Sequence, residues 1–545
     1  MVSFAWSADV SECEVISTDY RKGSHPTVEA EVPGRGKGML VLDTGAEGNL
    51  LDRSFRTGGE KLLSTGTVAD EVTGIEVPAS FFEHSNLVIG GRIHLSNLPM
   101  VYSDLETSEI FGMLGAKGVL GVPFFATHRV LFSSDDSKIS IARNDGIALA
   151  VSEVPGWRAV ALFREGDGSV GRSRLFVPVE LPLLGLWFAR LDTGSNGTVT
   201  MGRSIPIAMS LTADFTPRYV SGASGVAGRV AMLGGELSTF GIGGNRFTNF
   251  SCSTGFEGVT VGMGVIEEFN ALVDVENGNL WLQSSKTQQL DRNPKIDFHG
   301  MRFAPPEMKV LLVIPEAPAA KAGIQVGDSI VKIGEVEVTL PLLQSKCAEA
   351  AGMDKTLVIV LERNGEMRSV ELQPEDYFGE QRNELIGVAR RHISGIDSRF
   401  GDESAVDLLL AGRLRELGII EGSNPTAADC YEGAMDKGSL RAAVFLGRIL
   451  MKAGKIDEGV ALLRRAAEGV DLEAIRSLPG ALRLTRANET EVERWRAVAN
   501  LLHLPYEAAA TPASAGGADS IAWANGFIVS LRERLLRGEV LLPMF

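Results

Sequence analysis

The sequence predicts a multidomain protein with two all-β lobes in its first half, then a small α+β domain and finally an α-helical repeat domain. Three observations predict this fold class. A chain of 545 residues is too long for one hydrophobic core. A pattern of strand-like apolar runs occurs twice before residue 290, and small residues recur at a helical-repeat spacing towards the end. The expected domains are an N-lobe at 1–148, a C-lobe at 149–292, the α+β domain at 296–376 and the helical domain at 380–545.

A short motif, Leu-Asp-Thr-Gly followed by a small residue, opens the repeated pattern in each lobe. It spans Leu42–Ala46 and again Leu191–Ser195. Each copy is followed by an apolar run that ends in two glycines, at Val88–Gly91 and Gly241–Gly244. A single Asp-Thr-Gly is more often a turn at the end of a strand, with the Asp capping the backbone. The repeated context therefore carries the functional prediction, rather than the triplet alone.

On these motifs, the first half of the chain resembles the aspartic peptidases, closest to retropepsin-like lobes, with both lobes in one polypeptide. The resemblance implies that the two turns meet and that Asp43 and Asp192 form a catalytic pair. It also implies that an apolar-apolar-Gly segment packs beside each turn, at Val119–Gly121 and, less cleanly, at Gly262–Gly264. The residues expected to support the pair are Thr44, Gly45, Thr193, Gly194 and Ser195.

Each supporting residue type has a physical reason to be there. Glycine lets the backbone turn tightly and approach its neighbour, which a Cβ would obstruct. By the resemblance, the two threonine hydroxyls hydrogen-bond across the axis and hold the turns together. The first copy has Ala46 where the second has Ser195, so one hydroxyl donor is absent near Asp43. This difference predicts that the two carboxylates are unequal.

The chemistry of amide hydrolysis without a metal agrees with this reading. Two carboxylates about 3 Å apart cannot both ionise, so they share one proton and their apparent pKa values separate. The ionised member can take a proton from water while the protonated member polarises the scissile carbonyl. These titrations belong to the pair, so base and acid are not assigned to one residue.

The family covers its substrate with glycine-rich hairpin flaps, which the resemblance places between each triplet and its double glycine. In the second lobe the interval 221–228 fits, with Gly222, Ser224 and Gly225 as flap candidates. In the first lobe the interval ends at Gly74 and is more acidic. Glycine-rich segments are ordinary surface loops more often than functional lids, and that is the alternative to the flap prediction.

The segment Pro315–Ile333 resembles the PDZ domains attached to bacterial proteases. A hairpin turning at Asn364-Gly365 follows, and Leu342–Ala351 is expected to be helical. The resemblance implies binding of hydrophobic C-terminal peptides as an added strand; a purely internal brace is the alternative. The residues of the expected carboxylate loop are Gly300, Met301, Arg302 and Phe303.

Residues 380 to 545 are expected to be helical. Gly412 and Gly447, each followed by Arg and an apolar residue, recur at a spacing typical of tetratricopeptide-like repeats. Such arrays usually bind other proteins, so a protein partner is predicted for this domain.

Composition excludes several other classes of function. The net charge of −16 and the pI near 5.1 disfavour nucleic acid and anionic membranes as partners. The N-terminus has no basic-then-apolar signal, and the most apolar stretch, Phe176–Ala189, is interrupted and too short to span a bilayer. Four scattered cysteines favour a reducing compartment, so we expect a cytoplasmic protein. No motif indicates a metal or a cofactor.

Together these features predict a cytoplasmic aspartic endopeptidase whose PDZ and helical domains recruit substrate or regulate access. The alternative is a catalytically silent or gated scaffold that binds partners through the same domains. Truncation after about residue 290 is expected to activate a gated enzyme and to leave a scaffold silent.

Overall fold

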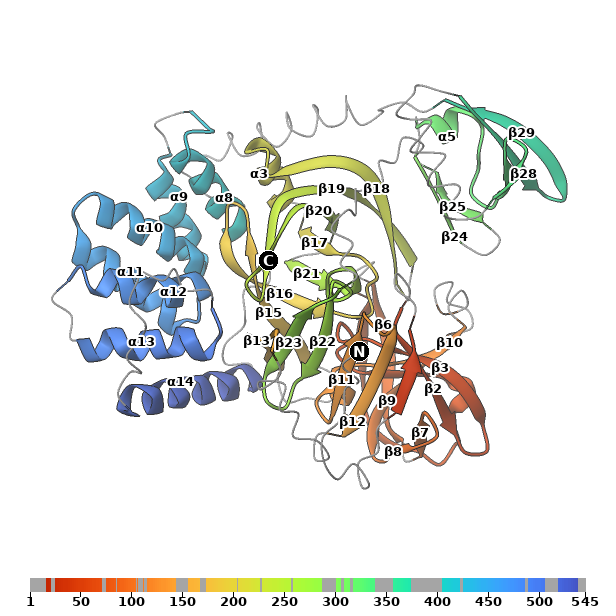
Figure 1. Ribbon diagram of the computed structural model, residues 1–545, viewed down its shortest axis with the longest axis horizontal. Helices are drawn as coiled ribbons and strands as arrows, with labels where there is room; N and C mark the ends of the chain where they lie inside the picture. Colours follow the sequence, from red (N-terminus) through yellow and green to blue (C-terminus); the bar gives the residue numbers. More distant parts are fainter. Residues whose placement is uncertain are drawn as a thin grey trace.

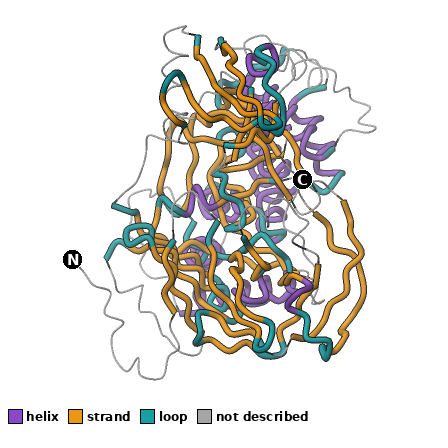
Figure 2. Tube along the Cα trace, turned by 90° about the vertical axis from the view of Figure 1, so that its right-hand side faces the viewer, coloured by secondary structure: helices purple, strands orange, loops and turns teal. Residues whose placement is uncertain are grey.

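The computed structural model has a β-rich first part and a helical C-terminal region (Figure 1). The long helices gather on one side of the molecule in Figure 1, and the view of Figure 2 shows strands along most of its length. The residues described are 16–20, 25–70, 75–84, 86–103, 105, 111, 115–143, 155–166, 173–202, 204–225, 228–255, 258–286, 300–304, 308–313, 317–338, 356–373, 404–421, 425–485, 489–504 and 518–537.

The first sheet contains nine strands in the order β5-β6-β9-β4-β10-β3-β2-β7-β8. Side chains alternate along its half-buried strands: Val28, Ala30 and Val32 are buried, whereas Glu29 is exposed. The short helical segments η2 (Arg53–Phe55) and α2 (Val122–Phe125) flank the sheet. Its strands are β2 (Thr27–Val32), β3 (Gly36–Leu42), β4 (Asn49–Asp52), β5 (Lys61–Asp70), β6 (Ile75–His84), β7 (Leu87–Ile89), β8 (Ile93–Leu95), β9 (Leu98–Ser103) and β10 (Ala116–Leu120).

The second sheet repeats much of this design in eight strands, in the order β14-β15-β16-β21-β17-β20-β19-β18. The repeat is in register: Thr27 pairs with Val41 between β2 and β3, and Phe176 pairs with Arg190 between β15 and β16. Helices α3 (Ser204–Leu211) and α4 (Met263–Ile266) accompany it. Its strands are β14 (Phe163–Gly166), β15 (Ser173–Leu181), β16 (Gly185–Asp192), β17 (Val199–Gly202), β18 (Phe215–Gly225), β19 (Gly228–Ile242), β20 (Asn245–Gly255) and β21 (Val259–Gly262).

A third sheet joins the two repeats, because its order β1-β12-β11-β22-β23-β13 takes strands from both. At its centre β11 pairs antiparallel with β22, with Val130 opposite Val273. All six residues of β22 are buried, as expected for a strand covered on both faces. The strands are β1 (Ile16–Asp19), β11 (His128–Ser133), β12 (Lys138–Arg143), β13 (Trp157–Ala161), β22 (Phe269–Asp274) and β23 (Asn279–Ser284).

A smaller β unit follows, with the strand order β24-β25-β26-β28-β29 and β27 beside β26. The predicted hairpin between β28 and β29 is confirmed, with Asn364 and Gly365 at positive φ in its turn. The predicted helix Leu342–Ala351 lies outside the described residues. The elements are β24 (Met301–Ala304), β25 (Lys309–Val313), α5 (Pro318–Lys321), β26 (Ser329–Ile333), β27 (Val336–Glu337), β28 (Leu357–Arg363) and β29 (Glu366–Leu372).

The C-terminal region consists of consecutive helices, several of which begin at a polar N-cap such as Ser404 or Thr426. Helices α10 and α11 approach closely at two glycines: a Cβ on Gly447 would lie 2.8 Å from the carbonyl oxygen of Gly459. Small residues thus permit close helix pairing, as the sequence predicted. The helices are α8 (Ala405–Glu416), α9 (Ala427–Asp436), α10 (Leu440–Lys452), α11 (Ile456–Glu468), α12 (Leu472–Leu482), α13 (Glu489–Leu501) and α14 (Ala518–Leu536).

Candidate active site

Both Asp-Thr-Gly turns follow an apolar strand, β3 or β16, that pairs in parallel with β10 or β21. The glycine that ends each partner strand packs tightly against the turn region. A Cβ on Gly121 would lie 2.1 Å from the carbonyl oxygen of Gly48, and one on Gly262 would lie 2.4 Å from that of Gly197. The expected apolar-apolar-Gly segment Val119–Gly121 therefore lies beside the turn of the first repeat. In the second repeat the matching segment is Thr260–Gly262, because Leu191 pairs with Val261 as Leu42 pairs with Leu120. The prediction of Gly262–Gly264 was wrong by two residues, since the local sequence did not reveal this pairing.

The two turns are joined by reciprocal hydrogen bonds between their threonines. The backbone N–H of Thr44 donates to Oγ1 of Thr193 at 2.9 Å, and that of Thr193 donates to Oγ1 of Thr44 at 3.0 Å. Each hydroxyl in turn donates to a carbonyl of the opposite strand, Leu191 or Leu42. Both threonines are fully buried. This brace fixes the distance between the turns.

The glycine of each turn lies against the carboxylate of the opposite turn, with no space for a side chain of its own. A Cβ added at Gly45 would lie 2.5 Å from Cγ of Asp192, and one added at Gly194 would lie 2.2 Å from Cγ of Asp43. Real Cβ atoms essentially never approach another atom this closely. The side chains of Asp43 and Asp192 also hydrogen-bond to each other. The structure thus brings together the two aspartates that the sequence singled out.

The two carboxylates have unequal surroundings. Ser195 donates its backbone N–H to Asp192 at 2.9 Å. Asp43 accepts three backbone N–H groups on one oxygen, at 2.7, 3.2 and 3.1 Å; the donors are Gly45, Ala46 and Gly194.

The pKa of Asp43 is raised from its ordinary value of 3.8 to about 7. Burial is the main cause, because it penalises the charged form, and the neighbouring charge of Asp192 is the next. The Gly45 hydrogen bond and the positive charge of Arg190 act in the opposite direction. Because two carboxylates in contact titrate together, the pair holds one proton up to neutral pH.

Sequence reasoning missed two side chains at this site. Arg190, two residues before Asp192, donates a hydrogen bond to the carbonyl of Gly45. His25 donates one to the backbone carbonyl of Gly194 and lies within reach of the charge of Asp192. No motif marks them, because their relation to the turns depends on how β2 pairs with β3 and how β15 pairs with β16.

The flap candidates lie on hairpins. Gly222, Ser224 and Gly225 belong to β18, which pairs with β19 from Phe215 opposite Leu237 to Gly225 opposite Gly228. In the first lobe β5 and β6 form the corresponding hairpin, but Gly74 lies outside the described residues.

The expected carboxylate loop of the small β unit is largely a strand. Gly300 has a positive φ, and Met301, Arg302 and Phe303 belong to β24. Met301 is buried in the core of the unit, so its side chain packs inward. Of the described strands, only β25 pairs with β24, which places β24 at an edge of the sheet.

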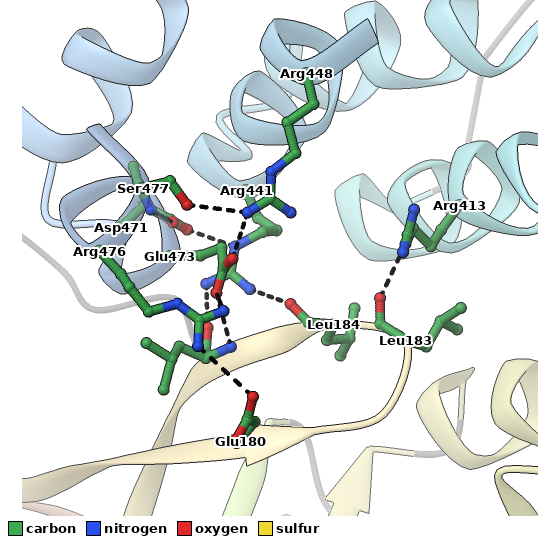
Figure 3. A network of polar contacts seen from close by, with 12 residues as sticks. Glu180, Leu183, Leu184, Arg413, Arg441, Arg448, Asp471, Glu473, Arg476 and Ser477 are labelled. Carbon is green, nitrogen blue, oxygen red and sulfur yellow. Dashed lines mark hydrogen bonds and ion pairs between the residues drawn. The ribbon is translucent and has the colours of Figure 1, made fainter. Parts of the chain in front are cut away.

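The helical region is fixed to the second lobe by a polar network around the β15–β16 hairpin (Figure 3). Arg441 donates to the carbonyls of Leu184 and Leu186 and pairs with Asp471 at 2.7 Å. Glu473 accepts the backbone N–H of Leu186 at 3.3 Å. Apolar residues of β14, β15 and β16 share one buried core with helices α10 to α14. The face of the helical region turned to the second lobe is therefore occupied by the chain itself.

Within the described residues, no group of three or more His, Cys, Asp or Glu side chains is placed to hold a metal ion. No helix in the same part of the chain is both long and apolar enough to cross a membrane.

Comparison with family models gave no match, and comparison with curated proteins gave none either. Among solved structures, the aspartic proteinase from Irpex lacteus aligns with a TM-score of 0.33 and 12% identity over 51% of this chain and 99% of that one. Basic 7S globulin from soybean aligns with a TM-score of 0.33 and 10% identity over 50% of this chain and 95% of that one.

Proposed function

We propose that the protein is an aspartic endopeptidase in which Asp43 and Asp192 activate a water molecule to hydrolyse peptide bonds in a polypeptide. The observation that carries this proposal is the contact between the two carboxylates, each lying over the glycine of the opposite turn. On this proposal, residues 1–148 and 149–292 are the two lobes of an aspartic peptidase fold.

The geometry supports a general acid–base mechanism. The ionised carboxylate takes a proton from water, whose oxygen attacks the scissile carbonyl carbon, and the protonated carboxyl donates its proton to the carbonyl oxygen. The C–N bond of the tetrahedral intermediate then breaks as the protonated carboxyl gives its proton to the leaving nitrogen. The ionised carboxylate takes a proton from a hydroxyl of the intermediate, whose oxygen becomes the carbonyl of the new carboxylic acid, so the pair again holds a single shared proton. The threonine brace keeps the carboxylates in place through these steps.

A pair that keeps its proton until about pH 7 suits a compartment near neutrality, because both carboxylates would otherwise be ionised there. This supports the cytoplasm as the proposed location.

The remaining regions have proposed roles in substrate handling. We assign the small β unit, within 296–376, to binding hydrophobic C-terminal peptides along β24, since that strand is at a sheet edge. The helical domain, within 380–545, would meet a protein partner on the faces that do not contact the second lobe. Its contact with the β15–β16 hairpin also gives it a means to regulate the site.

The test is cleavage of a complex peptide mixture at pH 4 to 8, read by mass spectrometry. Wild type is compared with Asp43→Asn and Asp192→Asn, each of which should abolish cleavage while preserving the circular dichroism spectrum. Cuts that persist in either variant contradict the proposal. No cuts by wild type at any pH would favour the silent or gated scaffold instead.

A further inference from the structure

Each Asp-Thr-Gly turn receives a side-chain hydrogen bond from the opposite lobe. Arg190, from β16 of the second lobe, donates to the carbonyl of Gly45. His25, which lies just before β2 of the first lobe, donates to the carbonyl of Gly194. The two contacts cross between the lobes, but one donor is a permanent cation and the other is a titratable imidazole.

The strand register identifies the counterpart of His25 in the second lobe. Thr27 pairs with Val41 in one repeat, and Phe176 pairs with Arg190 in the other. Two residues before the first member of each pair stand His25 and Arg174. An arginine in the second lobe thus occupies the place that a histidine occupies in the first.

The residues at the matching place after each catalytic candidate also differ in charge. Arg174 forms an ion pair with Glu47, the fourth residue after Asp43, across the two lobes. The fourth residue after Asp192 is Asn196, which carries no charge. One side of the site therefore has a compensated pair of charges, and the other side has a histidine and an amide.

We propose that His25 is a positioning residue of the active site that, by remaining neutral beside Asp192, allows the two carboxylates to keep their shared proton near neutral pH. This inference rests on the proposed function, and it names the residue that sets its pH range. A permanent cation at this position would stabilise the doubly ionised pair and drive the proton off.

The charges around His25 support this assignment. Burial lowers the pKa of His25 more strongly than the Gly194 carbonyl and Asp192 raise it, so the imidazole is neutral at pH 7. Asp192 and Arg190 are the charged side chains that act on Asp43. Arg174, on the other side, has its charge matched by Glu47.

The direct test is the upper titration midpoint of the pair, measured by ¹³C NMR on protein labelled at the aspartate Cγ. The Asp43 signal is identified by its absence in Asp43→Asn. We expect His25→Arg to lower the midpoint by about one pH unit and His25→Gln, which keeps a donor without charge, to leave it in place. His25→Arg with Asn196→Glu recreates the ion pair of the other side and should return the midpoint towards the wild-type value. An unchanged midpoint in a folded His25→Arg variant overturns the proposal.

A second measurement covers the case in which His25→Arg does not fold. The chain has seven histidines, so the His25 signal of histidine-labelled protein can be identified by its loss in His25→Gln. Asp192→Asn removes the anion beside the ring and should lower the titration midpoint of that signal by about one unit; no change would also refute the proposal. If instead only the proposed peptidase function is wrong, wild type cleaves no peptide, although the titration midpoints of the Asp43 and His25 signals both move as expected.

Discussion

The backbone N–H of Gly194 donates a hydrogen bond to Oδ1 of Asp43 at 3.1 Å, across the boundary between the two lobes. The same oxygen also accepts the N–H of Gly45 at 2.7 Å. Asp43 is thus held by both turns, and the two halves of the site are chemically distinct despite their common motif.

Asp43 should make the folded protein less stable as the pH rises. Its pKa is about 7 in the folded state against an ordinary 3.8, so the folded state binds more protons than the unfolded state between these values. Stability is therefore fully retained below pH 4 and declines as the pH rises to 7. We expect Asp43→Asn to be more stable than wild type at pH 8, by up to about 4 kcal/mol. The difference should vanish at pH 4 in chemical denaturation.

Asp135→Asn provides a control of opposite sign. Asp135 accepts hydrogen bonds from Ser285 at 2.7 Å and from the backbone N–H of Lys286 at 2.8 Å, and its pKa is lowered despite partial burial. The stability that ionised Asp135 contributes is present above its ordinary pKa, and it is lost as the pH falls through the lowered pKa of the folded state. Asp135→Asn should therefore be the less stable protein at pH 7. If the stabilities of Asp43→Asn and Asp135→Asn relative to wild type changed with pH in the same direction, the opposite pKa shifts assigned to Asp43 and Asp135 would be contradicted.

Alanine at either turn glycine should abolish catalysis. The added Cβ would lie 2.5 Å or less from the opposite carboxylate carbon, so the pair must separate. We expect kcat/KM of Gly45→Ala and Gly194→Ala to fall by at least about 100-fold, as misplacement of reacting groups by about 1 Å does elsewhere. Gly59→Ala is the matched control, because its Cβ would meet no atom within 4 Å. Near wild-type activity in Gly194→Ala would mean that the carboxylates need not touch.

Removal of the threonine hydroxyls should weaken the contact between the lobes. In Thr44→Val or Thr193→Val, a buried N–H loses its acceptor, at a cost of roughly 1 to 3 kcal/mol in unfolding free energy. The serine variants keep the hydroxyl and should lose much less. Urea denaturation and cleavage assays on the four proteins test this. Equal losses in the serine and valine variants would indicate packing of the methyl group, rather than hydrogen bonding, as the cause.

The sequence predicted the paired turns because both copies carry the same local motif, and a repeated motif is visible without knowing how strands pair. His25 and Arg190 were missed because their positions depend on strand register, and only the pairing of β2 with β3 and of β15 with β16 shows their relation to the turns. The docking of the helical region was equally hidden, since Arg441 meets carbonyls in β16 and the preceding turn that are more than 250 residues away. Domain boundaries read from composition do not reveal such contacts.

This docking also changes how gating should be tested. Truncation near residue 290 would expose the core that Phe163, Phe176 and Phe188 share with the helices, so we expect the product to aggregate. Deletion of the small β unit alone, residues 296–376, leaves that core covered. Increased cleavage by the deletion protein would identify the small unit as the gate, and unchanged cleavage would exclude it from that role.

Arg441 should be the residue on which the docking of the helical region depends most. Arg441 and Asp471 are 4% exposed, and Arg441 also binds two carbonyls at the hairpin where β16 begins. Arg441→Met leaves the Asp471 carboxylate buried without its partner, which typically costs roughly 3 to 5 kcal/mol. Arg464→Met, which breaks a pair with Glu491 whose side chains are 38% and 32% exposed, should cost less than about 1 kcal/mol.

Because β16 ends at Asp192, loosening its first residues should also reach the active site. Hydrogen exchange in Arg441→Met is expected to increase along β15 and β16 and to stay unchanged in β2 and β3 of the other lobe. Cleavage should fall together with the protection of β16. Faster exchange confined to the helices, with full activity, would show that the second lobe holds its catalytic strand without their support.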